Sequence, residues 1–225
     1  MPSSRAQQFR RRLLAWYRRR GRALPWRQTT DPYRILVSEV MLQQTQVGRV
    51  LPKYRAFLRR YPSIAALARA HVQEVRELWY PLGYNIRPVR LWTVANEVVH
   101  RHNGKVPDER ERLLALPGIG PYTAGAILSF AYRRRVPVLD TNVRRVLQRV
   151  FYGRSCPDRV LWHLAGQLLP RRPYDFNQAL MDFGALVCTA RRPACPTCPM
   201  ATFCRSYGWF ARDTGRAGAR RAARR

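Results

Sequence analysis

The chain is poor in acidic residues and has almost no lysine. Of its 225 residues, 13 are Asp or Glu and 42 are Lys or Arg, which gives a formal net charge of +29. The only lysines are Lys53 and Lys105, so nearly all of the positive charge belongs to arginine. So large an excess of positive charge favours a polyanionic partner, and nucleic acid is the default. A GC-rich genome would also raise the arginine count, but it would not explain the shortage of acids.

Long apolar runs are absent as well. No stretch reaches the length of about 20 residues that spans a membrane, and the first twenty residues lack the apolar core of a signal peptide. We therefore expect a cytoplasmic, nucleoid-associated protein with no membrane partner. With 46% hydrophobic residues, the chain still has enough apolar material for a sizeable core in one domain or two lobes.

Strand-like alternation is missing, and helical periodicity runs through almost the whole chain. Pro, Gly and Asp separate the periodic segments, as at Leu24-Pro25 and Pro117-Gly118. An all-α fold is therefore predicted. From about Ala211 onward the chain is mainly Arg, Ala and Gly, which predicts a disordered basic tail. The helices are expected at residues 5–19, 33–46, 47–60, 63–69, 72–79, 87–102, 109–115, 121–132, 141–151, 158–168 and 174–187.

Cysteine is scarce, yet four of the five cysteines lie close together. Cys188, Cys195, Cys198 and Cys204 have the spacing Cys-x6-Cys-x2-Cys-x5-Cys, and only Cys156 lies apart. Disulfides would require an oxidising compartment. Structural zinc sites made of four cysteines usually show two short pairs, whereas four cysteines with one short pair suit a [4Fe–4S] cluster. The spacing favours iron–sulfur and leaves zinc open.

A glycine-rich hairpin lies between two predicted helices, in the segment Leu116-Pro117-Gly118-Ile119-Gly120-Pro121-Tyr122. Pro121 suits the first position of a helix, where the N–H that it lacks would have no partner. Gly118 and Gly120 permit positive φ angles and leave backbone N–H groups directed outward. Together with the positive end of the following helix, these groups predict a phosphate-binding site. The alternative is an ordinary tight turn.

Two carboxylates stand alone in apolar surroundings. Glu39 is the only charged residue between Arg34 and Arg49, and Asp140 is the only one from Val136 to Val143. Burial raises the pKa of a carboxyl group, which suits a general acid. The alternatives are a buried ion pair for Glu39 and a helix N-cap for Asp140. Two such groups near a phosphate-binding hairpin suggest hydrolysis of a glycosidic bond, with one acid and one stabiliser of the sugar cation.

These motifs together resemble the helix-hairpin-helix, Gly/Pro-Asp superfamily of DNA base-excision glycosylases with a C-terminal [4Fe–4S] loop. LPGIGPYTAGAIL matches the family hairpin, VLDTNVRRV carries the family aspartate, and the four cysteines match the cluster spacing. The resemblance runs from about Leu24 to Cys204. It implies two helical lobes with a DNA cleft between them, a [4Fe–4S] cofactor, and a monomer that binds double-stranded DNA containing a mismatched or damaged base pair.

Within the superfamily, the segment from Leu24 to Val47 and the segment FNQALMDFGALVC are most similar to the adenine glycosylases, which remove adenine opposite 8-oxoguanine or guanine. By position, Glu39 resembles the acid that protonates the adenine ring. Asp140 resembles the residue that stabilises or captures the sugar cation, with Asn142 assisting. Tyr122 occupies the position that is lysine in the endonuclease III branch. Because tyrosine cannot form a Schiff base, the resemblance implies a monofunctional enzyme.

The remaining family positions concern DNA. Arg27, Gln44 and Tyr84 match residues that line the base pocket or wedge into the duplex, and Gly118 and Gly120 would contact phosphate. The resemblance divides the chain into a basic N-terminal helix (1–23), a glycosylase core (24–187), a cluster loop (188–204) and a basic tail (205–225).

Three departures keep two other interpretations open. The chain ends at Arg225, without the further domain that adenine glycosylases usually carry. The usual family segment LGYY reads Leu82-Gly83-Tyr84-Asn85, after Pro81 in place of a glycine. A compact length and a tyrosine at the lysine position also occur in thymine–guanine mismatch glycosylases of the superfamily. The first alternative is a glycosylase for thymine or uracil opposite guanine. The second is a DNA-binding module without catalysis.

Overall fold

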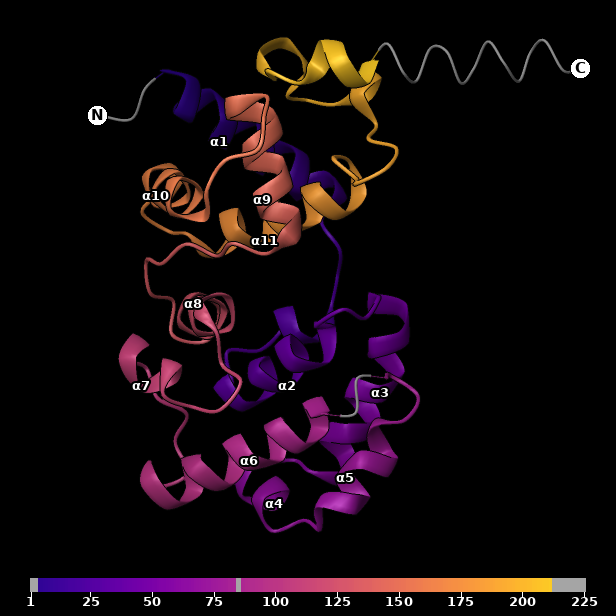
Figure 1. The fold of residues 1–225 in the computed structure, drawn as a ribbon, viewed down its shortest axis with the longest axis vertical. Coiled ribbons are helices and arrows are strands. Elements are labelled where there is room, and N and C mark those ends of the chain that lie inside the picture. The colour runs from indigo at the N-terminus through magenta and orange to yellow at the C-terminus, as the bar shows by residue number, and fades with distance from the viewer. Residues whose placement is uncertain (1–3, 84–85, 212–225) are drawn as a thin grey trace, which may run out of the picture. The chain divides into compact units, whose positions relative to one another are not determined.

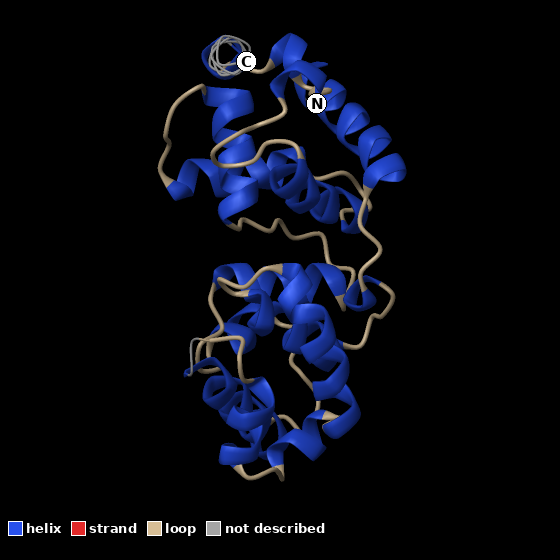
Figure 2. Cartoon of the chain, turned by 90° about the vertical axis from the view of Figure 1, so that its right-hand side faces the viewer, coloured by secondary structure: helices blue, strands red, loops and turns tan. Residues whose placement is uncertain are grey.

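The computed structural model of the protein describes residues 4–83 and 86–211. Every regular element in these ranges is helical (Figure 2), which confirms the all-α fold. The chain divides into two compact units. We call Ala23–Arg134 the central unit, and the residues before and after it together the terminal unit. No helix in the described ranges is long and apolar enough to cross a membrane. The DNA cleft expected between two lobes stays a prediction.

The central unit is built around two buried helices, α2 and α8. Helix α2 is buried from Ile35 to Met41, and α8 is buried from Thr123 to Phe130, so each is apolar on nearly all sides. They pack against each other, and α6 lies beside α4 and α5 (Figure 1). The elements are a 3₁₀ helix η1 (Pro25–Arg27) and the helices α2 (Pro32–Leu42), α3 (Val47–Arg60), α4 (Ile64–Ala68), α5 (Val72–Trp79), α6 (Ile86–Arg101), α7 (Arg110–Leu114) and α8 (Pro121–Phe130).

Side-chain caps start several of these helices where the sequence predicts a start. Asp31 accepts a hydrogen bond from the backbone N–H of Tyr33 at 2.9 Å, and Ser63 accepts one from that of Ala66 at 3.2 Å. The observed bounds of α3 and α5 equal the predicted ones. The prediction of one helix over 33–46 is wrong, because α2 ends at Leu42 and Gln44 adopts a left-handed φ of 54°.

The terminal unit joins the two ends of the chain. Helix α1 packs along α11, and Phe9 and Leu13 of α1 are fully buried. The Asp182 carboxylate, also fully buried, accepts hydrogen bonds from the Arg22 guanidinium at 2.6 and 2.8 Å. The elements are α1 (Ser4–Arg20), α9 (Thr141–Leu147), the π-helical turn η2 (Gln148–Tyr152), α10 (Asp158–Leu168), α11 (Tyr174–Leu186) and the 3₁₀ turns η3 (Cys195–Thr197) and η4 (Ala201–Phe203).

The folded part of the chain extends past Cys204. Backbone N–H groups of Arg205 and Ser206 donate to the carbonyls of Val150 and Arg149 at 3.2 and 3.1 Å. Ser206 is buried, and the Arg149 guanidinium lies 4.1 Å from the centre of the Phe210 ring. Residues 205–211, which the sequence analysis assigns to the basic tail, are therefore held on η2 by these contacts. The rest of that tail, residues 212–225, lies outside the described residues.

Candidate active-site residues and iron–sulfur loop

Glu39 is held in the core of the central unit by a tyrosine. It lies in the middle of α2 and is 3% exposed. Tyr122, the second residue of α8, donates its hydroxyl hydrogen to Oε2 of Glu39 across 2.7 Å. Because α2 and α8 pack together, this bond orients the carboxyl group between two packed helices. A carboxyl group oriented in this way, in apolar surroundings, has the environment of a general acid.

Asp140 begins α9 in the terminal unit and is half-buried. Its Oδ1 accepts from the backbone N–H of Val143 at 2.6 Å, and its Oδ2 accepts from the Asn142 amide at 2.9 Å. Burial raises the pKa of Asp140 above its ordinary value, and these hydrogen bonds and the Arg145 charge oppose the rise. The predicted N-cap is confirmed, and Asn142 is the neighbour that orients the carboxylate.

Asn142 is in turn held by Arg145 and by a close approach of α11. Arg145 donates through Nη2 to Oδ1 of Asn142 at 2.7 Å and through Nε to the carbonyl of Cys188 at 2.7 Å. A Cβ atom on Gly184 would lie 2.7 Å from Cβ of Asn142, so only glycine permits this packing. The surroundings of Asp140 are therefore defined by α9, α11 and the first residue of the cysteine loop.

The hairpin between α7 and α8 has the predicted turn, with one difference. Gly118 adopts a φ of 79°, but Gly120 has an extended conformation with a φ of −92°. Gly120 is the N-cap of α8, and a Cβ atom there would meet nothing within 4 Å. The exposed side chain of Arg90 lies against Gly118, where a Cβ atom would lie 2.9 Å from its Cδ. An open backbone at a helix N-terminus beside an arginine suits a phosphate group.

The other predicted DNA contacts have varied surroundings. Arg27 is half-buried in η1, and Gln44 is exposed in the turn after α2. Tyr84 lies outside the described residues. Left-handed backbone is uncommon for a residue other than glycine, and such conformations concentrate at functional sites. The φ of Gln44 therefore marks this turn as a candidate contact surface.

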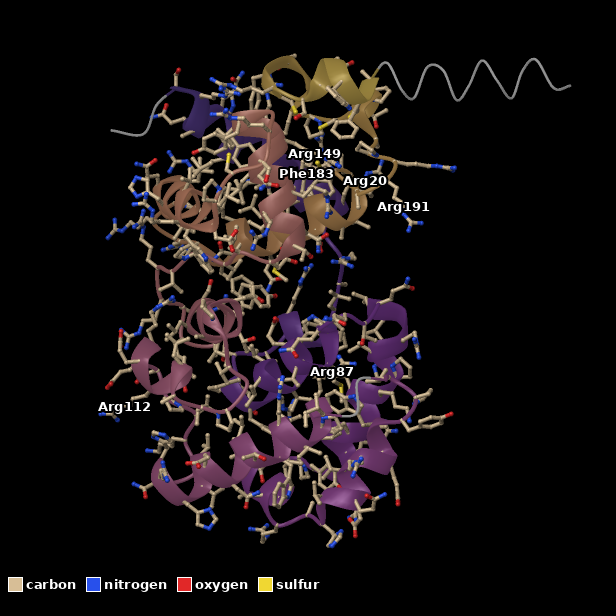
Figure 3. All side chains as sticks on the ribbon, viewed as in Figure 1. Arg20, Arg87, Arg112, Arg149, Phe183 and Arg191 are labelled. Carbon is tan, nitrogen blue, oxygen red and sulfur yellow. The ribbon has the colours of Figure 1, made fainter. Side chains whose placement is uncertain are left out.

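The four clustered cysteines line one small cavity in the terminal unit. Its wall also contains Arg149 and Phe183 (Figure 3). No three His, Cys, Asp or Glu side chains in the described ranges stand close enough to hold a metal ion. Four cysteines that line one cavity supply the ligand set of an iron–sulfur cluster.

Burial disfavours the thiolate form of three of these cysteines. It raises the pKa of Cys198 to about 12 and also raises the pKa values of Cys195 and Cys204. Cluster ligands are thiolates, so binding of a cluster would release protons and would couple cluster binding to the folding of this loop. Cys188, Cys195, Cys198 and Cys204 would hold the cluster, and Arg149 donates a hydrogen bond to the Cys188 sulfur at 3.7 Å.

Sequence reasoning missed three arginines that organise these residues. Arg145 and Arg90 are described above, and Arg87 of α6 donates to backbone carbonyls at the end of α2. No pattern distinguishes them from the other basic residues of the chain, because each of them contacts a residue more than twenty positions away in sequence.

Comparisons with known proteins place the chain in a family. Residues 37–164 match the model of the HhH-GPD superfamily base excision DNA repair protein. Residues 188–204, which contain all four clustered cysteines, match the iron–sulfur binding domain of endonuclease III. The second match agrees with the [4Fe–4S] cofactor predicted from the cysteine spacing.

Individual relatives cover most of the chain. The adenine DNA glycosylase of Mycobacterium tuberculosis is 49% identical over 84% of this chain and 64% of its own length. The thymine/uracil-DNA glycosylase of Pyrobaculum aerophilum is 42% identical over 86% of this chain and 88% of its own. A solved structure of a thermostable thymine-DNA glycosylase superposes with a TM-score of 0.84 and 32% identity, covering 91% of this chain and 97% of that one.

The lengths of the relatives differ. This chain spans less than two thirds of the adenine DNA glycosylases that it matches, with coverage between 39% and 64% of their lengths. It spans 88% and 97% of two thymine glycosylases. The extent and identity of the matches show that the chain belongs to the HhH-GPD superfamily of base excision DNA repair proteins.

Proposed function

We propose that the protein is a monofunctional DNA glycosylase that removes adenine from a mispair with 8-oxoguanine or guanine. The observation that carries this proposal is the buried Glu39, held by a hydrogen bond from Tyr122. Glu39 supplies an oriented acid, and its partner Tyr122 cannot form a Schiff base. The identity to adenine DNA glycosylases, up to 49%, supports adenine as the base.

The chemistry is hydrolysis of the N-glycosidic bond. Glu39 donates a proton to a ring nitrogen of the base, which leaves with the bonding electrons. The Asp140 carboxylate stabilises the positive charge that develops on the sugar, and a water molecule adds to C1′. The proton of that water passes to Asp140, whose raised pKa suits it as an acceptor. Asn142 and the N–H of Val143 keep the carboxylate in place.

Before this reaction, the protein must bind the DNA and the target base must leave the base stack. We assign phosphate contacts to the Gly118–Gly120 hairpin, and base-pocket or wedge contacts to Arg27, Gln44 and Tyr84. The chain is proposed to act as a monomer on double-stranded DNA. Extrusion of a base costs a few kcal/mol, and less for a mispair, which favours mismatched targets.

One assay tests the reaction and the base together. Duplexes with A·8-oxoguanine, A·G, T·G and U·G pairs are incubated with the protein, and strand breaks are read after alkali. Release of adenine is expected, without breaks before alkali. Glu39→Gln and Asp140→Asn should each lower the rate by about 10³-fold, whereas Glu74→Gln, on an exposed residue of α5, should leave it unchanged.

A second candidate is the removal of thymine or uracil opposite guanine. The identity of 42% and 39% to two thymine glycosylases favours it. Cleavage only at T·G and U·G pairs would establish this function in place of the first. Cleavage before alkali, with covalent trapping by borohydride, would contradict the monofunctional mechanism. If no duplex is cleaved, the remaining interpretation is a DNA-binding module without catalysis.

A further inference from the structure

Arg87 is a buried cation with an unusual set of partners. It lies near the start of α6 in the central unit and is 2% exposed (Figure 3). Its Nη1 donates to the carbonyls of Val40 at 3.2 Å and Met41 at 2.9 Å, and also to that of Gln43. These carbonyls belong to the last turn of α2 and the residue after it. The guanidinium thus binds the C-terminal end of the helix that carries Glu39.

The other terminal nitrogen of Arg87 binds a second turn of the chain. Its Nη2 donates to the carbonyls of Leu82 and Gly83, each at 3.0 Å, and to Oγ1 of Thr45 at 3.0 Å. Residues 43–45 form what we call the Gln44 turn, and residues 80–83 form the Tyr80 turn. One guanidinium therefore joins two turns that lie almost forty residues apart in sequence.

Two cations of α3 bind backbone carbonyls of the second turn and of the end of α5 before it. Arg49 donates to the carbonyl of Pro81 at 2.5 Å, and Lys53 donates to that of Leu78 at 3.1 Å. Helix α3 follows the Gln44 turn directly, so these bonds also tie the two turns together. Three basic side chains therefore bind the backbone of the two turns and of the end of α5.

The side chains presented by these turns are exposed. Gln44 is exposed and has a left-handed backbone, and Tyr80 is 74% exposed. The two turns thus carry an exposed aromatic ring and an exposed amide on backbone that Arg87 links, and such side chains are suited to contact bases that have left the stack. Burying a charge is costly. We therefore interpret a buried guanidinium that binds two exposed turns as serving the arrangement of these turns.

We propose that Arg87 is a positioning residue that fixes the Gln44 and Tyr80 turns in one arrangement for extrusion of the target base. The proposal rests on the glycosylase function above. A surface that is already ordered loses little conformational entropy when DNA binds. More of the binding free energy can then offset the free-energy cost of extruding the base. The planar guanidinium suits this role because it directs five N–H groups in fixed directions, whereas a lysine ammonium cannot serve both turns at once.

The test compares extrusion of the target base from a fully paired duplex with extrusion from a duplex that is destabilised around this base. Single-turnover rates are measured on the same mispair in a paired duplex and in a duplex where mismatches flank it, so that the target base unstacks more readily. Arg87→Lys is expected to lower the rate about tenfold on the paired duplex and less than about threefold on the flanked one. Arg101→Lys, on the exposed end of the same helix, is the matched control and should change neither rate.

A milder variant and a binding measurement separate positioning from folding. Thr45→Val removes one acceptor of Arg87 and should produce the same selective loss to a smaller extent. Affinity for undamaged duplex, and its salt dependence, should stay unchanged in both variants, because a buried guanidinium releases no counterions from DNA. Equal losses of rate on both substrates would overturn the proposal. A wild-type protein that releases no base from any duplex would instead overturn the proposed function.

Discussion

The central and terminal units each hold one candidate carboxylate, but by different means. Glu39 lies within a helix and is oriented by a side chain of another helix, Tyr122. Asp140 lies at a helix start and is oriented mainly by its own segment, through Val143 N–H and Asn142. A carboxyl group that a tyrosine hydroxyl orients in an apolar core suits proton donation. A carboxylate with several donors at a positive helix end suits stabilisation of a cation.

The units also differ in what stabilises them. The central unit relies on apolar burial along α2 and α8. The terminal unit adds a loop of four cysteines around a cavity, so part of its stability depends on a cofactor. The comparison predicts that each unit can be disturbed separately.

The largest effect is expected from loss of a cluster ligand. In Cys198→Ser the loop loses one of four donors, so absorbance near about 400 nm should disappear and backbone amides near residues 188–206 should exchange rapidly. Amides of α2 and α8 should keep their protection, as hydrogen exchange would report. Cys156→Ser is the control and should behave as wild type. Equal loss of protection in α2 and α8 would contradict the separation of the units.

The next largest effect distinguishes activity from stability at Asp140. Its folded pKa is raised, so the folded state binds the proton more tightly than the unfolded state does. The free energy of unfolding then falls as pH rises from the ordinary value of 3.8 through the raised one, and stays lower above it. Asp140→Asn should lose activity about 10³-fold, yet unfold at the wild-type temperature or above it at pH 7, since Asn also caps helices.

Thermal unfolding from pH 4 to 8 measures the second part of this prediction. The difference in unfolding temperature between Asp140→Asn and wild type should grow as pH rises and then level off. A lower unfolding temperature for the variant at pH 7 would mean that its hydrogen bonds outweigh the burial of its charge.

A smaller effect is expected from Tyr122→Phe, which removes the hydroxyl that orients Glu39. We expect a loss of rate of about 10-fold to 100-fold in single-turnover assays, because a misaligned acid transfers its proton less efficiently. Tyr132→Phe is the control, since Tyr132 donates to the carbonyl of Val106 and has no bond to Glu39. It should change stability but leave the rate intact. A wild-type rate in Tyr122→Phe would remove this hydrogen bond from the mechanism.

The smallest effect concerns the packing that holds Asn142. Gly184→Ala places a methyl group against Asn142 and should lower the free energy of unfolding by about 1–3 kcal/mol. Gly166→Ala, in the open interior of α10, should raise it by about 0.5–1 kcal/mol. Denaturant titration of the two variants measures the contrast. Equal shifts in both would show that α11 can move away from α9 at no cost.

Much of this protein can be predicted from the sequence because the relevant signals are local. Periodicity and capping residues predicted every α-helix of the described ranges, and the observed bounds of α3, α5 and α10 equal the predicted ones. The cysteine spacing indicated an iron–sulfur centre, and the isolation of Glu39 and Asp140 from other charges identified both as candidates. Each signal depends on neighbours within about twenty residues.

The tertiary structure decided the features that depend on distant partners. Tyr122 reaches Glu39 across 83 positions, and Arg145 joins Asn142 to Cys188. Arg87 ends α2 at Leu42 by binding its last carbonyls, where periodicity alone predicted a helix to residue 46. A guanidinium in a basic chain can pair with any carbonyl that the fold brings near, and residue type does not reveal which one. The identities of the candidate groups are therefore local properties, whereas their orientation results from packing.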